Sequence, residues 1–433
     1  MEKELDGKKI LILGGGILSK DIVLTAQKMG LYTIVTDWYD VQRSPVKLMA
    51  DEYWDVSIED YDLLSQLIKE HNVDGVFTSF TDSYLLPYQK LCEINGLPFY
   101  ANKKAFENSV NKDLFKRMCE QNHVPVVPEY DYRTFDPTTL SSKNAVVIKP
   151  VDNSGARGIT YCDNPNDYEI SINVALDNSP SKHIILERFI SNKGTTMSVR
   201  YIAVDGELYL HLVGDRYVLD DIDGKALITA ASFYPSKHTK FYMENYDNAV
   251  KQMFKSVGVA NGALFMESFC NGKDIYFYEM GMRLSGAMTY NITKSTNNVN
   301  ELEMLLRYAI TGKMCEIESL SQINPYLNGH YSASISLPLT QGEIASIEGL
   351  SVITEHPKIY AFSQRYKVGD VIEAHHIGTL FQLFGRFSII TDSKEELIDV
   401  VNIIIDSVSV KDKNGNEMFI SSKLRTILND YIS

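Results

Sequence analysis

Two glutamates in one short stretch have the spacing of a metal site. Glu267 and Glu279 lie in apolar and aromatic runs on either side of a Cys-Asn-Gly-Lys-Asp segment, which predicts a β-hairpin. If the turn is centred on Lys273, the two carboxylates lie directly opposite each other on one face. A two-residue turn at Asn271 and Gly272 would place them on opposite faces instead.

Like charges that oppose each other across a sheet are destabilising, unless one is protonated or a cation lies between them. Magnesium fits such a pair, because it prefers oxygen ligands and completes its shell with water and phosphate oxygens. Arg283 follows Glu279 by four residues, so strand periodicity places it on the same face. The competing interpretation is a hairpin with two solvated glutamates.

The N-terminal elements have the order of a doubly wound α/β domain. A strand over Lys9–Leu13, three glycines, a helix over Ser19–Lys28 and a strand over Tyr32–Thr36 follow one another, and a helix near Tyr61–Glu70 comes after them. Farther along the chain, the sequence predicts a hairpin at Asp205-Gly206 and a helix near Lys394–Ser407. The third glycine of the dinucleotide fingerprint is missing, although Asp37 occupies the place of a ribose-binding acid. We therefore favour a substrate-binding or structural role over nucleotide binding for this domain.

Further cations and a glycine-bearing loop follow between residues 103 and 187. A single helix is predicted over Lys103–Gln121, with Lys112 lying off its apolar stripe of Phe106, Val110, Leu114 and Met118. The strand that ends at Lys149 leads into a loop of small residues, Asp152–Gly158, whose successive N–H groups could contact an anion or could form an exposed hairpin loop. Glu187 lies among apolar neighbours, as a carboxylate does when it is paired or bound to a ligand.

The totals describe an ordinary globular protein. The 433 residues are 44% hydrophobic and 23% charged, and the formal net charge of −14 argues against a nucleic-acid partner. The five cysteines show no C-x-x-C spacing and are expected to be reduced, which favours a cytoplasmic location. No segment has the apolar length that a membrane span requires.

In this order, these pieces resemble the ATP-grasp superfamily. The shared pattern is an α/β domain, a helix lysine, a strand lysine before a glycine-bearing loop, an acid for adenine, and two metal carboxylates followed by an arginine. The resemblance covers about residues 8 to 291, and the spacing of its last three residues matches biotin carboxylase and the large subunit of carbamoyl-phosphate synthetase. The β-rich C-terminal part is similar, more loosely, to L-amino-acid ligases.

The resemblance implies a fold that is α/β and α+β: an N-terminal doubly wound domain (1–123), a flexible lid (124–192), a metal-binding subdomain (193–324) and a C-terminal mixed sheet (325–433). It implies ATP and Mg²⁺, or Mn²⁺ in its place, as cofactors. Glu267 and Glu279 would bind the metal, and Arg283 and Lys149 would be catalytic. Residues implied to contact ATP are Lys112, Lys149, Ser154, Gly155, Gly158, Glu187, Arg188, Phe189, Ile190 and Thr196.

Two positions depart from the family pattern. Gly281 stands where relatives commonly have an asparagine that binds the second metal ion, and Thr196 stands where many have a ribose-binding glutamate. Arg386 has two interpretations, as a residue of the substrate site or of the surface.

The implied reaction is ATP-dependent ligation of a small carboxylate to an amine through an acyl phosphate, with a homodimer as one possible assembly. The alternatives are a carboxylase or carbamoyl-phosphate-synthetase-like enzyme acting on bicarbonate, and a nucleotide-binding protein of reduced catalytic function. A nicotinamide enzyme using Gly14–Asp37 is a further alternative.

Overall fold

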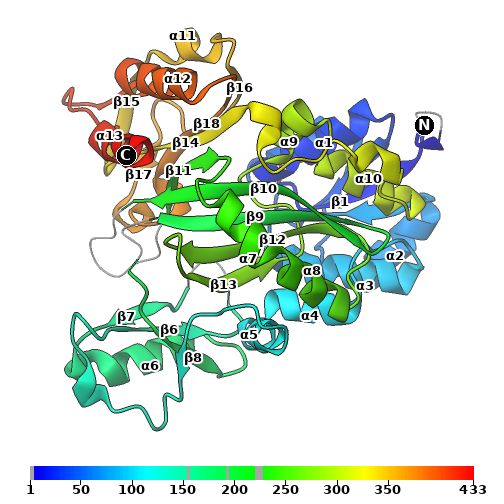
Figure 1. Ribbon diagram of the computed structural model, residues 1–433. Helices are drawn as coiled ribbons and strands as arrows, with labels where there is room; N and C mark the ends of the chain where they lie inside the picture. The colour runs from blue at the N-terminus through cyan, green and yellow to red at the C-terminus, as the bar shows by residue number, and fades with distance from the viewer. Residues whose placement is uncertain (1–3, 154–156, 192–194, 220–227) are drawn as a thin grey trace.

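The computed structural model describes residues 4–153, 157–191, 195–219 and 228–433. Its strands form four sheets, and one of them, with eight strands, runs through the middle of the molecule (Figure 1). A smaller N-terminal layer packs beside one end of this sheet. A second small sheet, with helix α6, projects from the other side.

The N-terminal sheet is parallel, with strand order β3-β2-β1-β4. Its strands β1 and β2 are apolar and almost completely buried, as parallel strands covered on both faces require. The predictions for β1, β2 and α2 are confirmed at the predicted residues. The elements of this layer are β1 (Lys9–Leu13), α1 (Lys20–Lys28), β2 (Tyr32–Thr36), β3 (Glu52–Trp54), α2 (Tyr61–Glu70), β4 (Gly75–Phe77) and α3 (Leu85–Asn95).

The single helix predicted over 103–121 is wrong. The chain forms α4 (Lys103–Val110) and α5 (Lys112–Gln121), and Asn111 between them is extended and accepts two backbone N–H groups of α5 as its N-cap. The predicted apolar stripe is broken as well, because Val110 and Leu114 are exposed. The new helix start makes Lys112 the first residue of α5.

The projecting sheet has the order β5-β8-β6-β7, and α6 covers its small core. Its elements are β5 (Glu129–Tyr130), β6 (Val146–Pro150), β7 (Thr160–Cys162), α6 (Tyr168–Asp177) and β8 (Ile184–Arg188). β6 and β8 pair antiparallel, so that Lys149 lies opposite Ile185 and Val147 lies opposite Glu187.

The eight-stranded sheet is antiparallel, with the order β13-β12-β9-β10-β11-β14-β18-β16. The predicted hairpin at Asp205-Gly206 joins β9 to β10, and both turn residues have the positive φ of a type I′ turn. The strands are β9 (Thr195–Val204), β10 (Glu207–Val218), β11 (Thr229–Tyr234), β12 (Gly262–Cys270), β13 (Ile275–Gly281), β14 (Tyr331–Pro338), β16 (Ile359–Gln364) and β18 (Leu383–Thr391).

Helices and a three-stranded sheet complete the chain. The sheet has the order β17-β15-β19, and α12 occupies the residues predicted for it. These elements are α7 (Thr239–Asn245), α8 (Asp247–Ser256), α9 (Tyr290–Asn297), α10 (Glu301–Thr311), β15 (Gly342–Glu348), α11 (Leu350–Thr354), β17 (Val371–Ile372), α12 (Lys394–Ser407), β19 (Ser409–Asp412) and α13 (Ser421–Ile432). Within the described ranges, no helix has the length and apolar character to cross a membrane.

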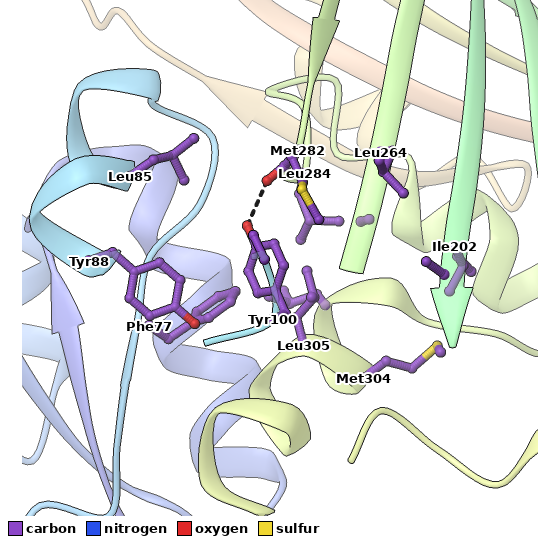
Figure 2. Close-up of a cluster of buried hydrophobic side chains, with 14 of the residues drawn as sticks. Phe77, Leu85, Tyr88, Tyr100, Ile202, Leu264, Met282, Leu284, Met304 and Leu305 are labelled. Atoms are coloured by element: carbon purple, nitrogen blue, oxygen red, sulfur yellow. Dashed lines mark hydrogen bonds between the residues drawn. The ribbon is translucent and has the colours of Figure 1, made fainter. Parts of the chain in front are cut away.

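A shared core joins the N-terminal layer to the central sheet (Figure 2). Phe77 and Tyr88 from the N-terminal side pack in the same cluster as Leu264 of β12 and Leu305 of α10. The Tyr100 hydroxyl donates a hydrogen bond to the carbonyl of Met282, at 2.7 Å. This core fixes the position of the N-terminal layer against the segment that carries Arg283.

The four-part division predicted from the sequence stays a prediction. The structure adds one fact that bears on it: β14, β16 and β18, from the predicted fourth part, belong to the same sheet as β9 and β12.

Candidate active site

Glu267 of β12 and Glu279 of β13 are directly paired in the sheet, as the sequence predicts. The reason differs from the predicted one. The loop has four residues, Asn271–Asp274, because Cys270 pairs with Ile275. A β-bulge at Tyr278 then shifts the register by one residue and brings the two glutamates opposite each other.

The pairing perturbs Glu279. Its pKa is raised, mainly because protein atoms replace water around it, and the charges of Glu267 and Asp82 raise it further, against the effect of Lys112 and Arg283. The side chain is nevertheless exposed. Binding of a cation beside Glu279, together with a ligand such as a nucleotide, would therefore stabilise its charged form.

Glu267 already has a cationic partner. Arg216 of β10 forms a partly buried ion pair with it. Burial lowers the pKa of Arg216, but the charge of Glu267 outweighs this and raises it overall. No group of three or more His, Cys, Asp or Glu residues in the described part of the chain is placed to hold a metal ion. Two carboxylates alone fit Mg²⁺ only if phosphate oxygens and water supply the other ligands, as is usual for this ion.

The missing asparagine at position 281 has a structural cause. A Cβ atom at Gly281 would overlap the ring of Phe265, which pairs with Gly281 across the hairpin. The same ring lies 5.2 Å from the guanidinium of Arg283 and 5.7 Å from that of Arg200. Phe265 therefore occupies the side-chain space at this position and contacts Arg283.

We expect Gly281→Ala to lower the free energy of unfolding by about 1–3 kcal/mol, because the added methyl group must displace the Phe265 ring. Gly286→Ala is the matched control, since nothing lies within 4 Å of a Cβ atom at that position. Urea unfolding of both variants measures the difference. Equal stabilities would show that the ring moves at no cost.

Three lysines lie where α5 meets the projecting sheet, and two of them pair with Glu187. Glu187 forms ion pairs with Lys149, at 2.6 Å, and with Lys116, at 2.8 Å. All three side chains are buried. Despite burial, which raises it, the pKa of Glu187 is lowered overall by these two lysines. Lys112 Nζ donates to the carbonyl of Asn153 at 2.6 Å, and burial lowers its pKa against the effect of nearby Glu279.

Sequence reasoning missed Lys116. It lies one helical turn after Lys112, so the i, i+4 spacing on α5 was the available signal. Its ammonium group also donates to the carbonyl of Val127 and lies 3.0 Å from Glu129.

The predicted adenine segment follows β8 directly. The N–H groups of Arg188 and Phe189 donate to the carbonyls of Pro128 and Ala145, both at 2.9 Å. The N–H of Ile190 makes no hydrogen bond to any group within the described ranges, so it is the donor that a base edge could use. Phe189 is 40% exposed.

Of the remaining residues predicted to contact ATP, the structure describes Thr196 and Gly158. Thr196 is buried on β9, and its hydroxyl faces the Tyr278 side of the sheet. Gly158 has φ +76°, and a side chain there would overlap Asn178, so the position requires glycine. Ser154 and Gly155 lie outside the described residues.

Arg283 is held by the N-terminal layer. Asp82, in the 3₁₀ turn Asp82–Tyr84 after β4, accepts two parallel hydrogen bonds from it, at 2.6 and 2.7 Å. The same carboxylate influences Glu279 and Lys112. Asp82 is a second residue that sequence reasoning missed, because its partner lies 201 positions away.

A buried acid and histidine lie behind this arginine. Glu301 Oε1 is 3.2 Å from Nδ1 of His211, and Thr293 donates to Oε2 at 2.6 Å. Burial raises the pKa of Glu301 to about 7 and lowers that of His211 to about 3, so the carboxyl group holds the proton and the ring stays neutral. A cavity of ≈10 Å³ between them and Arg200 has room for about one water molecule.

Because the pKa of Glu301 is raised by folding, this group stabilises the fold below its ordinary pKa of 4.5, and that contribution is lost as the pH rises through about 7. Glu301→Gln keeps a neutral group at every pH. As the pH rises from 4.5 to 8, we expect the free energy of unfolding of the variant to increase relative to that of the wild type by on the order of 2 kcal/mol. Thermal unfolding across this range measures it, and parallel curves would contradict the assignment.

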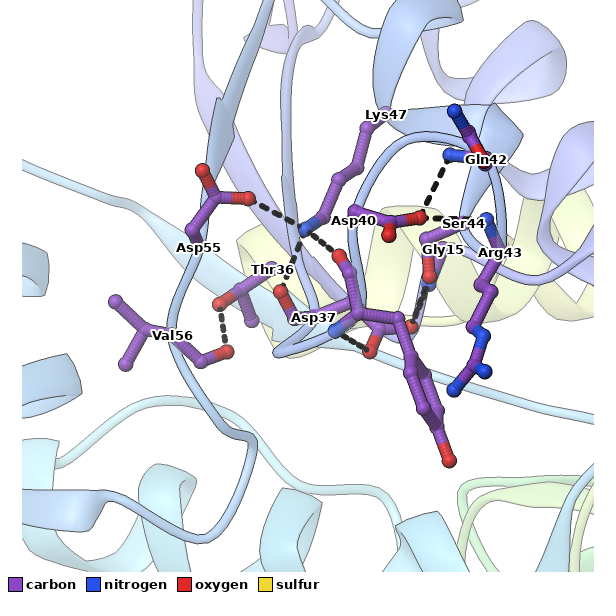
Figure 3. A network of polar contacts seen from close by, with 11 residues as sticks. Gly15, Thr36, Asp37, Asp40, Gln42, Arg43, Ser44, Lys47, Asp55 and Val56 are labelled. Atoms are coloured by element: carbon purple, nitrogen blue, oxygen red, sulfur yellow. Dashed lines mark hydrogen bonds and ion pairs between the residues drawn. The ribbon is translucent and has the colours of Figure 1, made fainter.

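The contacts of Asp37 argue against the nicotinamide interpretation of the N-terminal domain (Figure 3). The Asp37 carboxylate accepts hydrogen bonds from the Gly15 N–H at 2.8 Å, the Ser44 hydroxyl at 2.7 Å and the Tyr39 N–H at 3.1 Å. It is 4% exposed. A ribose would find no free oxygen on this side chain.

Arg386 of β18 points toward the segment after Arg283. It donates to the carbonyl of Gly286 at 2.7 Å and to the Ser336 hydroxyl at 3.2 Å. Burial lowers its pKa, and Arg216 and Arg365 lower it further. Within the described ranges it forms no ion pair, and its contact with Gly286 places it beside the segment that follows Arg283.

The fold is that of the ATP-grasp enzymes. The L-amino acid ligase of Bacillus licheniformis superposes with a TM-score of 0.76 at 18% identity, over 94% of this chain and 99% of that one. The N5-carboxyaminoimidazole ribonucleotide synthetase of Thermotoga maritima superposes with a TM-score of 0.67 at 19% identity, over 94% and 100%.

Sequence relatives point the same way. Formate-dependent phosphoribosylglycinamide formyltransferase of Prochlorococcus marinus is 25% identical over 309 residues, 69% of this chain and 75% of the relative. The protein of that name from Bacillus subtilis is also 25% identical, over 72% and 80%. No protein-family model matches the chain. The chain therefore has the fold of the ATP-grasp ligases, and in sequence it is similar to the formyltransferases named above.

Proposed function

We propose that the protein joins a small carboxylate to an amine at the expense of ATP, with the site residues named above. The observation that carries the proposal is the direct pairing of Glu267 with Glu279, with Lys112 and Arg283 close enough to shift the pKa of Glu279. This is an arrangement for neutralising a triphosphate and a transferring phosphoryl group.

In the first step, a carboxylate oxygen attacks the γ-phosphorus, the bond to the β,γ-bridging oxygen breaks, and ADP leaves. In the second, the amine attacks the acyl carbon and phosphate leaves with the bonding electron pair, which gives the amide after loss of a proton. Mg²⁺ held by Glu267 and Glu279 would supply positive charge to the phosphate oxygens. Lys112, Lys149 and Arg283 supply the protein's own share of that charge.

Glu187 keeps two lysines in position. Its carboxylate holds Lys149 at 2.6 Å in a buried setting, so the lysine charge is fixed before ATP arrives. The free N–H of Ile190 is the proposed donor to the purine. We assign the adjoining Arg188, Phe189 and Thr196, and the loop that contains Ser154, Gly155 and Gly158, to the same nucleotide.

The unpaired positive charge of Arg386, within the described ranges, favours a substrate that carries an anionic group. Its guanidinium is near Arg216 and Arg365 and has no carboxylate partner within the described ranges. The two formyltransferase relatives take, by their names, formate and phosphoribosylglycinamide. This pair therefore belongs in any screen of substrates.

A phosphate-release screen tests the proposal. Purified protein, ATP and Mg²⁺ are combined with paired acids and amines, including formate with phosphoribosylglycinamide, and Glu279→Gln is the blank. Release that requires both partners is expected. Release with bicarbonate alone would favour a carboxylase, and ATP binding without release for any pair would favour the protein of reduced catalytic function.

A further inference from the structure

The loop after β2 exposes two neighbouring aromatic side chains. Trp38 is 66% exposed and Tyr39 is 37% exposed, with ring centroids 4.5 Å apart. The other tryptophan of the chain, Trp54, is 7% exposed. Nothing in the described fold covers the Trp38 indole.

The backbone beneath these side chains is held firmly (Figure 3). Lys47 is completely buried, and its ammonium group donates to the carbonyl of Asp37 at 2.6 Å and to that of Tyr39, and pairs with Asp55 at 2.7 Å. A buried lysine that satisfies all three of its donors fixes the loop in one conformation. The two rings are therefore presented on a rigid support.

This support lies on the side of the N-terminal sheet that meets the active site. Tyr84 contacts the glycine turn after β1, since its ring fills the space where Gly14 would carry a Cβ atom. Burial raises the pKa of Tyr84, and the nearby charge of Asp37 raises it further. Tyr84 belongs to the same short turn as Asp82, which holds Arg283. The loop that carries the aromatic pair, the glycine turn after β1 and the turn that holds Arg283 are therefore neighbours.

The topology agrees with this placement. The loops after β1, β2 and β4 all leave the carboxyl ends of parallel strands, the edge where open α/β sheets bind their ligands. Ile17 and Leu18, which follow the glycine turn, are also exposed, at 51% and 38%. Two aliphatic side chains are therefore exposed at the same edge as Trp38 and Tyr39.

We propose that Trp38 and Tyr39 determine substrate specificity by packing against an apolar or aromatic side group of the carboxylic acid substrate, amino acids included. The inference rests on the proposed ligase reaction. Its kinetic test requires that reaction, whereas its second test measures binding alone. A face for a second copy of the chain is the competing explanation of the exposed rings.

The kinetic test compares Trp38→Ala and Tyr39→Ala with Tyr326→Ala, a tyrosine of similar exposure at 41%. The probes are phenylacetate against acetate and phenylalanine against glycine, each with ATP and a shared panel of amines. We expect at least one of the large probes to have a KM about tenfold below that of its small counterpart, and Trp38→Ala to remove that difference. The KM for ATP should stay within about twofold.

The binding test needs no turnover. Leucine and phenylalanine are titrated into the wild type and Trp38→Ala, and the difference between the two emission spectra reports Trp38 alone. A saturable blue shift, larger than that with glycine, supports the inference even if no phosphate is released, in which case only the proposed reaction fails.

Three results would overturn the inference. They are equal KM changes for large and small probes, an unchanged Trp38 spectrum with both amino acids, and a Trp38→Ala variant that turns a wild-type dimer into a monomer by sedimentation while its substrate preference stays the same. Circular dichroism of each variant confirms that the fold is retained.

Discussion

Glu279→Gln is expected to lower ATP-dependent phosphate release about 1,000-fold while leaving the fold intact. Glutamine keeps the shape of the side chain and removes the charge that, with Glu267, would hold Mg²⁺ against the triphosphate. The stability of the variant should equal or slightly exceed that of the wild type, because the raised pKa of Glu279 shows that its charge is disfavoured in the free protein.

The measurement is kcat with saturating substrates over a range of Mg²⁺ concentrations, with thermal unfolding of the same sample. Glu244→Gln, at an exposed glutamate of α7 paired only with Lys240, is the control and should behave as the wild type. A variant within tenfold of wild-type activity, with the same Mg²⁺ dependence, would show that Glu279 does not serve the metal.

The same carboxylate makes activity sensitive to acid. Since its pKa is raised, Glu279 takes up a proton at a higher pH than an ordinary glutamate, and Mg²⁺ affinity should weaken as the pH falls through that raised value. The wild type should therefore need more Mg²⁺ at pH 5.5 than at pH 8.

Arg283→Lys is expected to lower kcat about 100-fold. Lysine keeps the positive charge but cannot make the two parallel hydrogen bonds, at 2.6 and 2.7 Å, by which Asp82 fixes the arginine. The KM for ATP should change less than kcat, because the lost interaction concerns the phosphoryl group in transfer more than the bound nucleotide.

Asp82→Asn tests whether Asp82 positions this arginine. We expect a loss of about tenfold in kcat on its own and little further loss when it is combined with Arg283→Lys, since residues that act as one unit are not additive. Single-turnover measurements of the phosphoryl step are the readout. Fully additive losses would mean that Asp82 acts independently of Arg283.

Whether a feature can be predicted from the sequence depends on how far apart along the chain the interacting residues lie. β1, β2, α2 and α12 occupy the predicted residues because their signals are local: buried apolar runs, amphipathic periodicity and turn residues at their ends. The break at Asn111 was missed, since helix periodicity continues through it and only the capping geometry reveals it. Asp37 illustrates the opposite error, because its position matched a motif while its two oxygens already accept hydrogen bonds from Gly15, Ser44 and Tyr39.

The sequence by itself determined the kinds of chemistry that are available: two acids, an arginine four residues later, and lysines beside a glycine-bearing loop, in the order of one superfamily. Only the tertiary structure decided which of them meet. The bulge at Tyr278 sets the opposition of Glu267 and Glu279, and Asp82 reaches Arg283 across 201 positions. Strand register and long-range pairing follow from the packing of the whole sheet, which no local pattern of residues contains.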